Sequence, residues 1–192
     1  NKPEQRKAEM ITKKYGLHES DYILFLARLV PEKGLTYLID AFKQVKTNKK
    51  LVIAGGASDT NTFVQELKER AKDDKRIIFT GFVQGQILEE LYSNAYIYTL
   101  PSDLEGMPLS LLEAMSYANC CVVSDISECS EVVEDKAVIF KKGDVTDLRK
   151  KLQELCDKAE KVKKYNDEST DFICGKYNWD DVVDKTIRLY QR

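Results

Sequence analysis

Two cationic side chains, Arg28 and Lys33, follow the first strand-like run at a spacing that suits a diphosphate. They lie five residues apart in a loop that opens a helix-like segment. A guanidinium presents a planar fork to phosphate oxygens, and an ammonium presents a compact charge. The N-terminus of the following helix adds backbone N–H groups and a partial positive charge. We therefore predict a diphosphate contact; the alternative is a solvated Arg and Lys with Glu32 as a surface partner.

Two carboxylates, Glu105 and Glu113, belong to a second loop-to-helix segment, which follows the fourth strand-like run. Pro108 suits the first turn of a helix, which places Glu105 on the loop and Glu113 inside the helix. Free backbone N–H groups over residues 106–109 would point toward an anion. Apolar neighbours predict a partly buried Glu113, and a buried carboxylate needs hydrogen-bond donors such as vicinal sugar hydroxyls. The alternative is a loop acid that stabilises the helix dipole and an ordinary surface glutamate.

A glycine pair, Gly55 and Gly56, follows the second strand-like run. Glycine lets a backbone approach a ligand closely. The alternative is an ordinary strand-to-helix turn in which Ser58, Asp59 or Thr60 caps the helix. The residues alone leave both interpretations open.

Metal and dinucleotide chemistry find little support in the sequence. No GxGxxG follows the first strand-like run, which argues against a nicotinamide or flavin dinucleotide site. The single histidine, His18, precedes that run and so lies at the wrong end of a parallel sheet for chemistry. Five cysteines without a CxxC pair favour a reducing compartment and small buried hydrophobes over metal ligands. We expect no metal and no cofactor.

Charge and hydropathy exclude two further classes. The 30 Lys+Arg and 32 Asp+Glu give a formal net charge of -2, which argues against a dedicated nucleic-acid binder. No apolar run indicates a transmembrane helix or a signal peptide, so we expect a cytoplasmic protein. Basic clusters mixed with acids predict solvated helix faces; the alternative is weak peripheral contact with the anionic inner face of a membrane. These clusters cover residues 46–50, 149–151 and 161–164.

Alternating strand-like and helix-like segments must position these side chains. Six short apolar runs, several of them nearly continuous, are typical of strands buried on both faces of a parallel sheet. Helix-period stripes separate the first five runs, and the last of these stripes consists of Leu109, Leu112 and Met115. We expect a doubly wound, mostly parallel six-stranded α/β domain of the Rossmann-like class, with extra helices from residue 144 onward that break near Gly175. The runs cover residues 22–27, 51–55, 76–81, 95–100, 120–124 and 137–140.

Four sequence segments together resemble a known family. FLARLVPEKGLTYLIDAF, LVIAGG, IIFTGFV and LPSDLEGMPLSLLEAM resemble the C-terminal domain of family-4 retaining glycosyltransferases of the GT-B fold. The most specific element is the acid pair Glu105 and Glu113, with seven residues between them. The sequence departs from the family after this helix, where Gly and then Pro are usual. There Asn119 is expected to take the left-handed turn, since Asn tolerates it.

The resemblance implies a domain that binds a nucleoside-diphosphate sugar. Arg28 and Lys33 would contact its diphosphate, Glu105 the hydroxyls of its sugar and Glu113 its ribose. Arg28, Lys33 and Glu105 would be the catalytic residues, and no metal would take part. The other residues expected to line the nucleotide-sugar site are Gly55, Gly56, Val83, Gly106, Met107, Pro108 and Leu109, with main-chain atoms around Val83 near the base.

The resemblance further implies that the chain is one half of a two-domain enzyme. Residues 1–20 would form a linker helix from a missing N-terminal acceptor domain, residues 21–175 the nucleotide-sugar-binding domain and residues 176–192 a C-terminal helix. The whole enzyme would transfer a hexose-type sugar, such as that of a UDP-sugar, to a glycan or lipid acceptor in glycan biosynthesis. The chain alone would bind nucleotide and transfer little. The alternatives are a non-catalytic nucleotide- or phosphate-binding module of the same fold and a plain α/β interaction domain.

Overall fold

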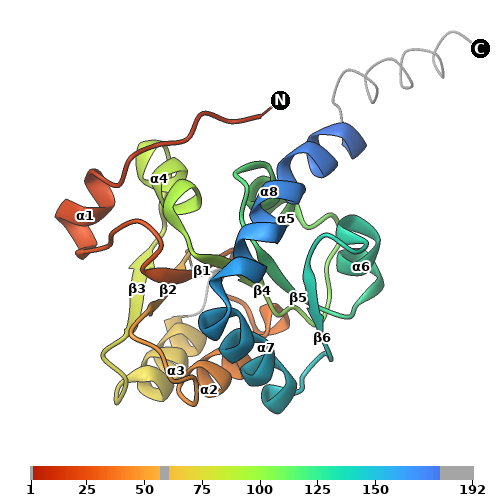
Figure 1. Ribbon diagram of the computed structural model, residues 1–192. Coiled ribbons are helices and arrows are strands. Elements are labelled where there is room, and N and C mark those ends of the chain that lie inside the picture. The colour runs from red at the N-terminus through yellow and green to blue at the C-terminus, as the bar shows by residue number, and fades with distance from the viewer. Residues whose placement is uncertain (1, 57–60, 178–192) are drawn as a thin grey trace, which may run out of the picture.

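The computed structural model describes residues 2–56 and 61–177, which form an α/β domain around one six-stranded sheet (Figure 1). The strands are β1 (Tyr22–Leu26), β2 (Lys50–Ala54), β3 (Ile77–Gly81), β4 (Ile97–Leu100), β5 (Cys121–Ser124) and β6 (Val138–Phe140). Every pairing is parallel, and the order is β3-β2-β1-β4-β5-β6. The predicted doubly wound class and six strands are confirmed, with a fully parallel sheet. The strand order reverses between β1 and β4, where doubly wound folds bind their ligands.

Helices cover both faces of this sheet. They are α1 (Met10–Tyr15), α2 (Leu35–Phe42), α3 (Asn61–Ala71), α4 (Gln86–Asn94), α5 (Leu109–Ser116), α6 (Ser127–Val133), α7 (Val145–Asp157) and α8 (Ala159–Lys176). Figure 1 shows α2, α3 and α7 on one face and α4 and α5 on the other. α2 packs against α3 and α7, α1 against α4, and α8 against α5. Because both faces are covered, β1, β4 and β5 are apolar and buried along almost their whole length.

The buried face of α5 differs from the predicted stripe. The structure buries Leu111, Ala114 and Met115, whereas Leu109 is 63% exposed. Spacings of three and four residues keep side chains on one helix face, and 111, 114 and 115 follow that pattern. In the predicted stripe, residues 109, 112 and 115 are three apart, and such a row drifts around the helix, so that only Met115 lies on the buried face. As a result, Leu109 stands on the outward face of the helix, four residues before Glu113.

A short helix between β5 and β6, α6, was not predicted. Its sequence SECSEVV begins with polar residues and hides a stripe at Cys129, Val132 and Val133, all of which are buried. The spacing of three and then one residue is the same as in α5. The apolar stripe is therefore present in the sequence, but a helix of only seven residues gives too short a pattern to predict.

The turn after α5 is made by a different residue from the one expected. Ala118 has the left-handed backbone, with a φ of 63°, and Asn119 does not. Asn119 is buried, and its side-chain N–H groups donate to the carbonyls of Tyr92 and Ala114 at 2.9 and 3.0 Å. These bonds tie the segment after α5 to α4, and the left-handed turn falls on the preceding residue, Ala118.

The two ends of the described chain are helical. α1 lies against α4, and Ile11 and Leu17 belong to the same buried core as the sheet. At the other end α8 stops at Lys176, next to Gly175, where a break was predicted. Most of the predicted C-terminal helix over 176–192 lies outside the described residues. Among the described helices, none is long and apolar enough to cross a membrane.

Candidate functional site

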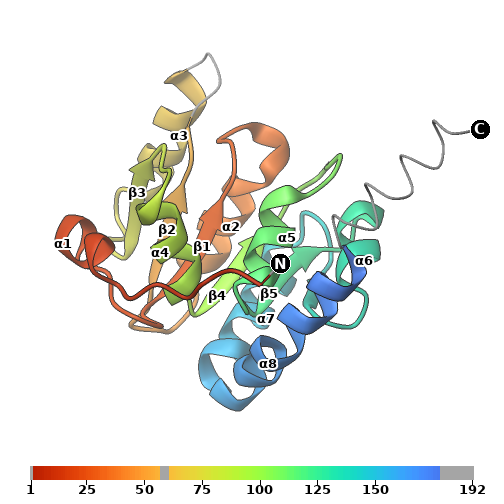
Figure 2. The same ribbon diagram turned by 90° about the horizontal axis from the view of Figure 1, so that it is seen from above.

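The predicted site residues lie at one edge of the sheet. Because the strands are parallel, their carboxyl ends share an edge, and the loops that follow β1, β2, β3 and β4 converge there. In Figure 2 the segments that precede α2 and α5 both lie at this edge. The first includes Arg28 and Lys33, and the second includes Glu105.

Lys33 and Glu105 form a tight ion pair. The Lys33 Nζ lies 2.7 Å from both Oε1 and Oε2 of Glu105, and the two side chains are 13% and 5% exposed. The Ser102 hydroxyl also donates to Glu105 Oε1, at 2.6 Å. Ser102 is itself fully buried, and its carbonyl accepts a 2.5 Å hydrogen bond from the Ser124 hydroxyl. A predicted cation and a predicted acid from two different loops therefore meet in one buried network.

Backbone contacts hold these two loops together. Gly34, which follows Lys33, has a φ of +67°, and a Cβ there would lie 1.9 Å from the carbonyl oxygen of Pro101. Only glycine fits both the conformation and the space. The backbone N–H of Asp103 donates to the carbonyl of Glu32 at 2.8 Å, and the Tyr37 hydroxyl donates to the Asp103 carboxylate. The close approach of the two loops places Lys33 beside Glu105.

Arg28 has a different environment from Lys33. Its side chain is exposed, and it forms no ion pair with any residue that the structure describes. Glu32, the alternative surface partner, uses its backbone carbonyl rather than its carboxylate in the loop contact. Arg28 can therefore meet an anion without first giving up a protein partner.

The prediction that Glu113 is partly buried is wrong. Glu113 is exposed, because it lies on the opposite side of α5 from Leu111 and Met115. Its Oε2 accepts a hydrogen bond of 3.2 Å from the hydroxyl of Tyr92, a buried residue of α4. Burial raises the pKa of Tyr92 well above its usual value, so the phenol keeps its proton and shares it between Glu113 and the carbonyl of Ser110, which lies 3.3 Å away. Among the described residues, Oε1 of Glu113 has no hydrogen-bond partner.

The expected row of free backbone N–H groups before α5 is shorter than predicted. The N–H of Leu109 donates to the carbonyl of Met107 at 2.9 Å, and Pro108 has no N–H. The carbonyl of Pro108 accepts bonds from Leu111 and Leu112. The N–H groups of Gly106 and Met107 have no acceptor in the described part of the chain, so these two could meet an anion.

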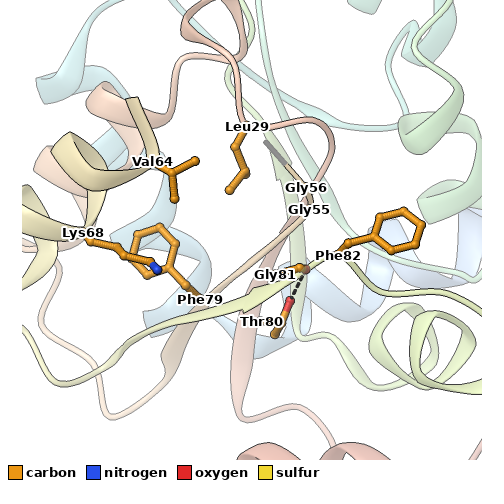
Figure 3. Close-up of a pocket in the computed structure, with 9 residues that line it drawn as sticks. All are labelled: Leu29, Gly55, Gly56, Val64, Lys68, Phe79, Thr80, Gly81 and Phe82. Atoms are coloured by element: carbon orange, nitrogen blue, oxygen red, sulfur yellow. Dashed lines mark hydrogen bonds between the residues drawn. The ribbon is translucent and has the colours of Figure 1, made fainter. Parts of the chain in front are cut away.

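The glycine pair after β2 borders a pocket of about 390 Å³ (Figure 3). Gly55 has a φ of +150°, and a Cβ there would lie 1.9 Å from the Ala27 carbonyl, so packing against β1 already requires glycine. The cap candidates Ser58, Asp59 and Thr60 lie outside the described residues. In Figure 3 Phe82 lies across the pocket from Val64 and Lys68. The lining residues are Leu29, Gly55, Gly56, Val64, Lys68, Phe79, Thr80, Gly81 and Phe82.

Exposed apolar side chains lie on the loops at the same edge. Phe82 follows β3 and is 72% exposed, and Leu104 and Met107 precede α5 at 63% and 58%. Val83, whose main chain is predicted to lie near a base, has a buried side chain. Its side chain therefore packs inward, and only its backbone can face a ligand.

His18 is a surface residue, and the cysteines are buried or half-buried. His18 is exposed and precedes β1, at the amino end of the sheet. The described cysteines are free thiols, and burial raises the pKa of Cys120 and of Cys129 to about 12. Thiols of that kind stay protonated at neutral pH and are poor nucleophiles and ligands. No group of His, Cys, Asp and Glu among the described residues is arranged to hold a metal.

Some lysines of the first and third basic clusters have partners within the domain. The Lys49 Nζ donates to the carbonyl of Ser20 at 2.7 Å, and Lys50 pairs with Asp21 at 3.1 Å. In the third cluster Lys161 lies 3.1 Å from a carboxylate oxygen of Glu154.

Two supporting residues were missed from the sequence, Ser102 and Tyr92. Ser102 follows Pro101, the first residue after β4, and precedes Glu105 by three residues, a spacing at which its hydroxyl can bond to the carboxylate of the same loop. Tyr92 belongs to a helix before β4, and nothing in its local sequence relates it to Glu113. It stacks on Tyr117 with ring centroids 5.4 Å apart, which fixes its ring beneath α5.

Curated glycosyltransferases are similar in sequence to most of this chain. An uncharacterized glycosyltransferase of Methanocaldococcus jannaschii is 29% identical over 174 residues, which are 88% of this chain and 44% of that protein. The O-antigen chain mannosyltransferase B of Escherichia coli is 28% identical over 139 residues, 70% of this chain and 36% of that protein. The chain thus spans less than half the length of these relatives.

Solved structures share the fold at low identity. HepE from Anabaena, solved with UDP and glucose, superposes with a TM-score of 0.87 at 17% identity. The match includes 95% of this chain and 51% of the HepE chain. Sucrose-phosphate synthase from Thermosynechococcus elongatus has a TM-score of 0.81 at 18% identity and covers 99% and 51%. The family described as Glycosyl transferases group 1 matches residues 7–172. The chain therefore belongs to the glycosyl transferases of group 1, and it corresponds to the C-terminal half of GT-B enzymes of that family.

Proposed function

We propose that this chain is the nucleotide-sugar-binding domain of a retaining glycosyltransferase that transfers a hexose-type sugar from a nucleoside diphosphate to a glycan or lipid acceptor. One observation supports this most directly. Lys33 and Glu105 meet at the carboxyl edge of the sheet, next to the point where the strand order reverses, and the exposed Arg28 follows the same strand, β1. A cation pair with an adjacent buried carboxylate suits a diphosphate that is joined to a polyhydroxylated group.

The chemistry needs charge stabilisation more than it needs a nucleophile. Transfer breaks the bond between the anomeric carbon and a diphosphate oxygen, so negative charge grows on the leaving group. Arg28, Lys33 and the N–H groups of Gly106 and Met107 would stabilise that charge without a metal. Glu105 would hold sugar hydroxyls rather than attack carbon, because a carboxylate whose charge is balanced by Lys33 and Ser102 is a weak nucleophile but still a hydrogen-bond acceptor.

The family and its members support the choice of ligand. The mannosyltransferase of Escherichia coli is named for the transfer of a hexose, and HepE from Anabaena was also solved in complex with UDP-glucose. These ligands belong to those proteins, and we extend their chemical class to this chain. The acceptor would bind to the other domain of the enzyme. We therefore expect the isolated chain to bind nucleotide sugar and to transfer little.

Calorimetric titration tests the proposal. UDP, GDP and ADP are titrated first, followed by UDP-glucose, GDP-mannose and ADP-glucose. We expect one base to bind best and its sugar conjugate to bind more tightly than the bare nucleotide. Equal affinities for conjugate and bare nucleotide would support a nucleotide- or phosphate-binding module instead. No binding of any of the six would overturn the assignment and favour an interaction domain.

A further inference from the structure

We propose that Glu105 distinguishes a nucleoside diphosphate that carries a sugar from one that does not, by acting as the counter-ion of Lys33 when no sugar is present. This inference rests on the proposed function, in which Lys33 contacts the diphosphate and Glu105 the sugar. Glu105 would then lower the affinity for a bare nucleotide and raise the affinity for its sugar conjugate.

The ligand-free contacts of Glu105 are already complete. Lys33 donates to both carboxylate oxygens at 2.7 Å, and Ser102 donates to one of them at 2.6 Å. These are short, charge-assisted hydrogen bonds, which are among the strong ones in proteins. The Glu105 side chain is only 5% exposed while Lys33 is bonded to it, so these three bonds, rather than water, stabilise its charge.

A bare diphosphate must therefore compete with Glu105 for Lys33. If the Lys33 ammonium turns toward phosphate oxygens, Glu105 keeps only the Ser102 hydroxyl and remains a buried anion close to a second anion. Removal of one partner from a buried ion pair leaves an uncompensated charge, which is strongly unfavourable. Glu105 thus weakens the binding of a nucleoside diphosphate that has no sugar.

A sugar changes the balance. Its hydroxyls can donate to the Glu105 oxygens in place of the Lys33 N–H groups, and Lys33 is then free to bond to the diphosphate. The same carboxylate therefore favours the sugar conjugate and disfavours the nucleotide that remains after transfer. In an active enzyme this difference would help the spent nucleotide to leave.

The decisive variant is Glu105→Gln, which keeps the size of the side chain and an oxygen for Ser102 but removes the charge. We expect its affinity for inorganic pyrophosphate, and for whichever of UDP, GDP and ADP binds the wild-type chain best, to rise roughly tenfold, the scale of one strong competing bond. The advantage of the sugar conjugate over the bare nucleotide should shrink or vanish. A merely structural role for Glu105 would weaken the binding of all these ligands.

Two further variants test the route through Lys33. Adding Lys33→Met to Glu105→Gln should abolish the gain. Ser102→Ala, which makes Glu105 depend on Lys33 alone, should weaken pyrophosphate and bare nucleotide more than the sugar conjugate, and it decides the question if Glu105→Gln does not fold. Calorimetry measures each constant, and thermal melting checks each fold.

The possible failures are distinct. If the wild-type chain binds no nucleotide, the proposed function falls and this inference falls with it. If the wild-type chain binds nucleotide but folded Glu105→Gln binds bare nucleotide no more tightly, only the inference is overturned. It is also overturned if Ser102→Ala leaves the preference for the sugar conjugate unchanged.

Discussion

Arg28 and Lys33, the two cations of the first loop, stand in different electrostatic environments. Lys33 is neutralised by Glu105, whereas Arg28 is exposed and has no ion-pair partner among the described residues. A ligand that binds Arg28 breaks no protein contact, but one that binds Lys33 must displace or share Glu105. The contribution of Arg28 to the affinity for a diphosphate should therefore not be reduced by the loss of a protein contact, unlike that of Lys33.

We predict that Arg28→Ala weakens the binding of nucleoside diphosphate by about 1.5–3 kcal/mol, the usual contribution of a hydrogen bond to a charged group. The dissociation constant from calorimetry measures the effect. Lys141→Ala is a matched control, because Lys141 is exposed and directly follows β6 at the same edge of the sheet. An unchanged constant for Arg28→Ala would remove Arg28 from the diphosphate site.

Tyr92 should matter through the orientation of Glu113. We predict that Tyr92→Phe, like Glu113→Gln, weakens nucleoside diphosphate more than inorganic pyrophosphate, because only the nucleotide has a ribose for Glu113 to hold. The expected loss is about 0.5–1.5 kcal/mol, the size of one ordinary hydrogen bond. Paired titrations with the two ligands measure it.

Tyr98→Phe provides the control for this variant. Tyr98 is also a buried tyrosine, with its ring 6.1 Å from that of Tyr92, but its hydroxyl bonds to Ser110 and Leu26 and not to Glu113. If both tyrosine variants lower nucleotide affinity equally, the effect comes from packing and Tyr92 does not act through Glu113.

At the scale of elements, the loop after β1 and the loop after β4 behave as one unit. Gly34 lets the backbone of Pro101 approach, and the resulting contact sets the distance between Lys33 and Glu105. On the other face, α4 is fixed at its outer side by the N-terminal segment. Glu90 of α4 accepts backbone hydrogen bonds from Glu9 and Ile11 at 3.1 and 3.0 Å.

We predict that Gly34→Ala destabilises the domain by about 2–4 kcal/mol, from the clash with Pro101 together with the cost of a left-handed alanine. Gly143→Ala separates the two contributions, because Gly143 has a φ of +72° and no atom within 4 Å of its missing Cβ. Chemical denaturation should show a loss of about 1–2 kcal/mol for the control, from the backbone alone. Equal losses in the two variants would mean that the loops can separate at no cost.

Glu90 predicts a pH dependence of stability. Burial favours the neutral acid, but hydrogen bonds from the Ile11 backbone and the Gln86 side chain outweigh it and lower the pKa of Glu90. A lowered pKa means that the stability contributed by Glu90 is fully present above the usual pKa of glutamate, and it is lost as the pH falls through the lower folded value.

We therefore expect Glu90→Gln to cost about 1–3 kcal/mol at pH 7 and progressively less below about pH 4. Unfolding by denaturant across this pH range measures the difference. Glu89→Gln is the matched control on the same helix, since the Glu89–Arg6 pair is exposed and should contribute less than about 1 kcal/mol. A difference between wild type and Glu90→Gln that is constant with pH would contradict the assignment.

At the scale of the whole molecule, ligand binding should stabilise the domain. A ligand that binds only the folded chain adds about 2.7 kcal/mol of stability at a concentration of 100 times its dissociation constant. We expect the best-binding nucleotide sugar to raise the melting temperature in proportion, and Arg28→Ala to reduce that shift. A rise that persists unchanged in Arg28→Ala would locate the ligand elsewhere.

The sequence predicted the fold better than it predicted the site. Near-continuous apolar runs that alternate with helix-period segments are typical of a covered parallel sheet, so the strands, the fold class and the edge where the loops converge could be predicted from local sequence patterns. The partners within that edge are long-range: Lys33 and Glu105 are 72 residues apart, and Tyr92 reaches Glu113 from another helix. The error at Glu113 arose because apolar neighbours in the sequence were expected to bury it, whereas on the eight-residue helix α5 it faces away from the buried Leu111 and Met115.

The approach of Gly34 to Pro101 also limits how this domain can be re-engineered. A loop graft that replaces residues 102–109 to alter sugar preference must keep the Pro101 carbonyl where Gly34 meets it. Otherwise Lys33 moves together with Glu105, and a graft intended to change the sugar preference also changes the affinity for the diphosphate. Libraries that vary the two loops together, with Gly34 fixed, should therefore yield more folded and functional variants than libraries that vary either loop alone.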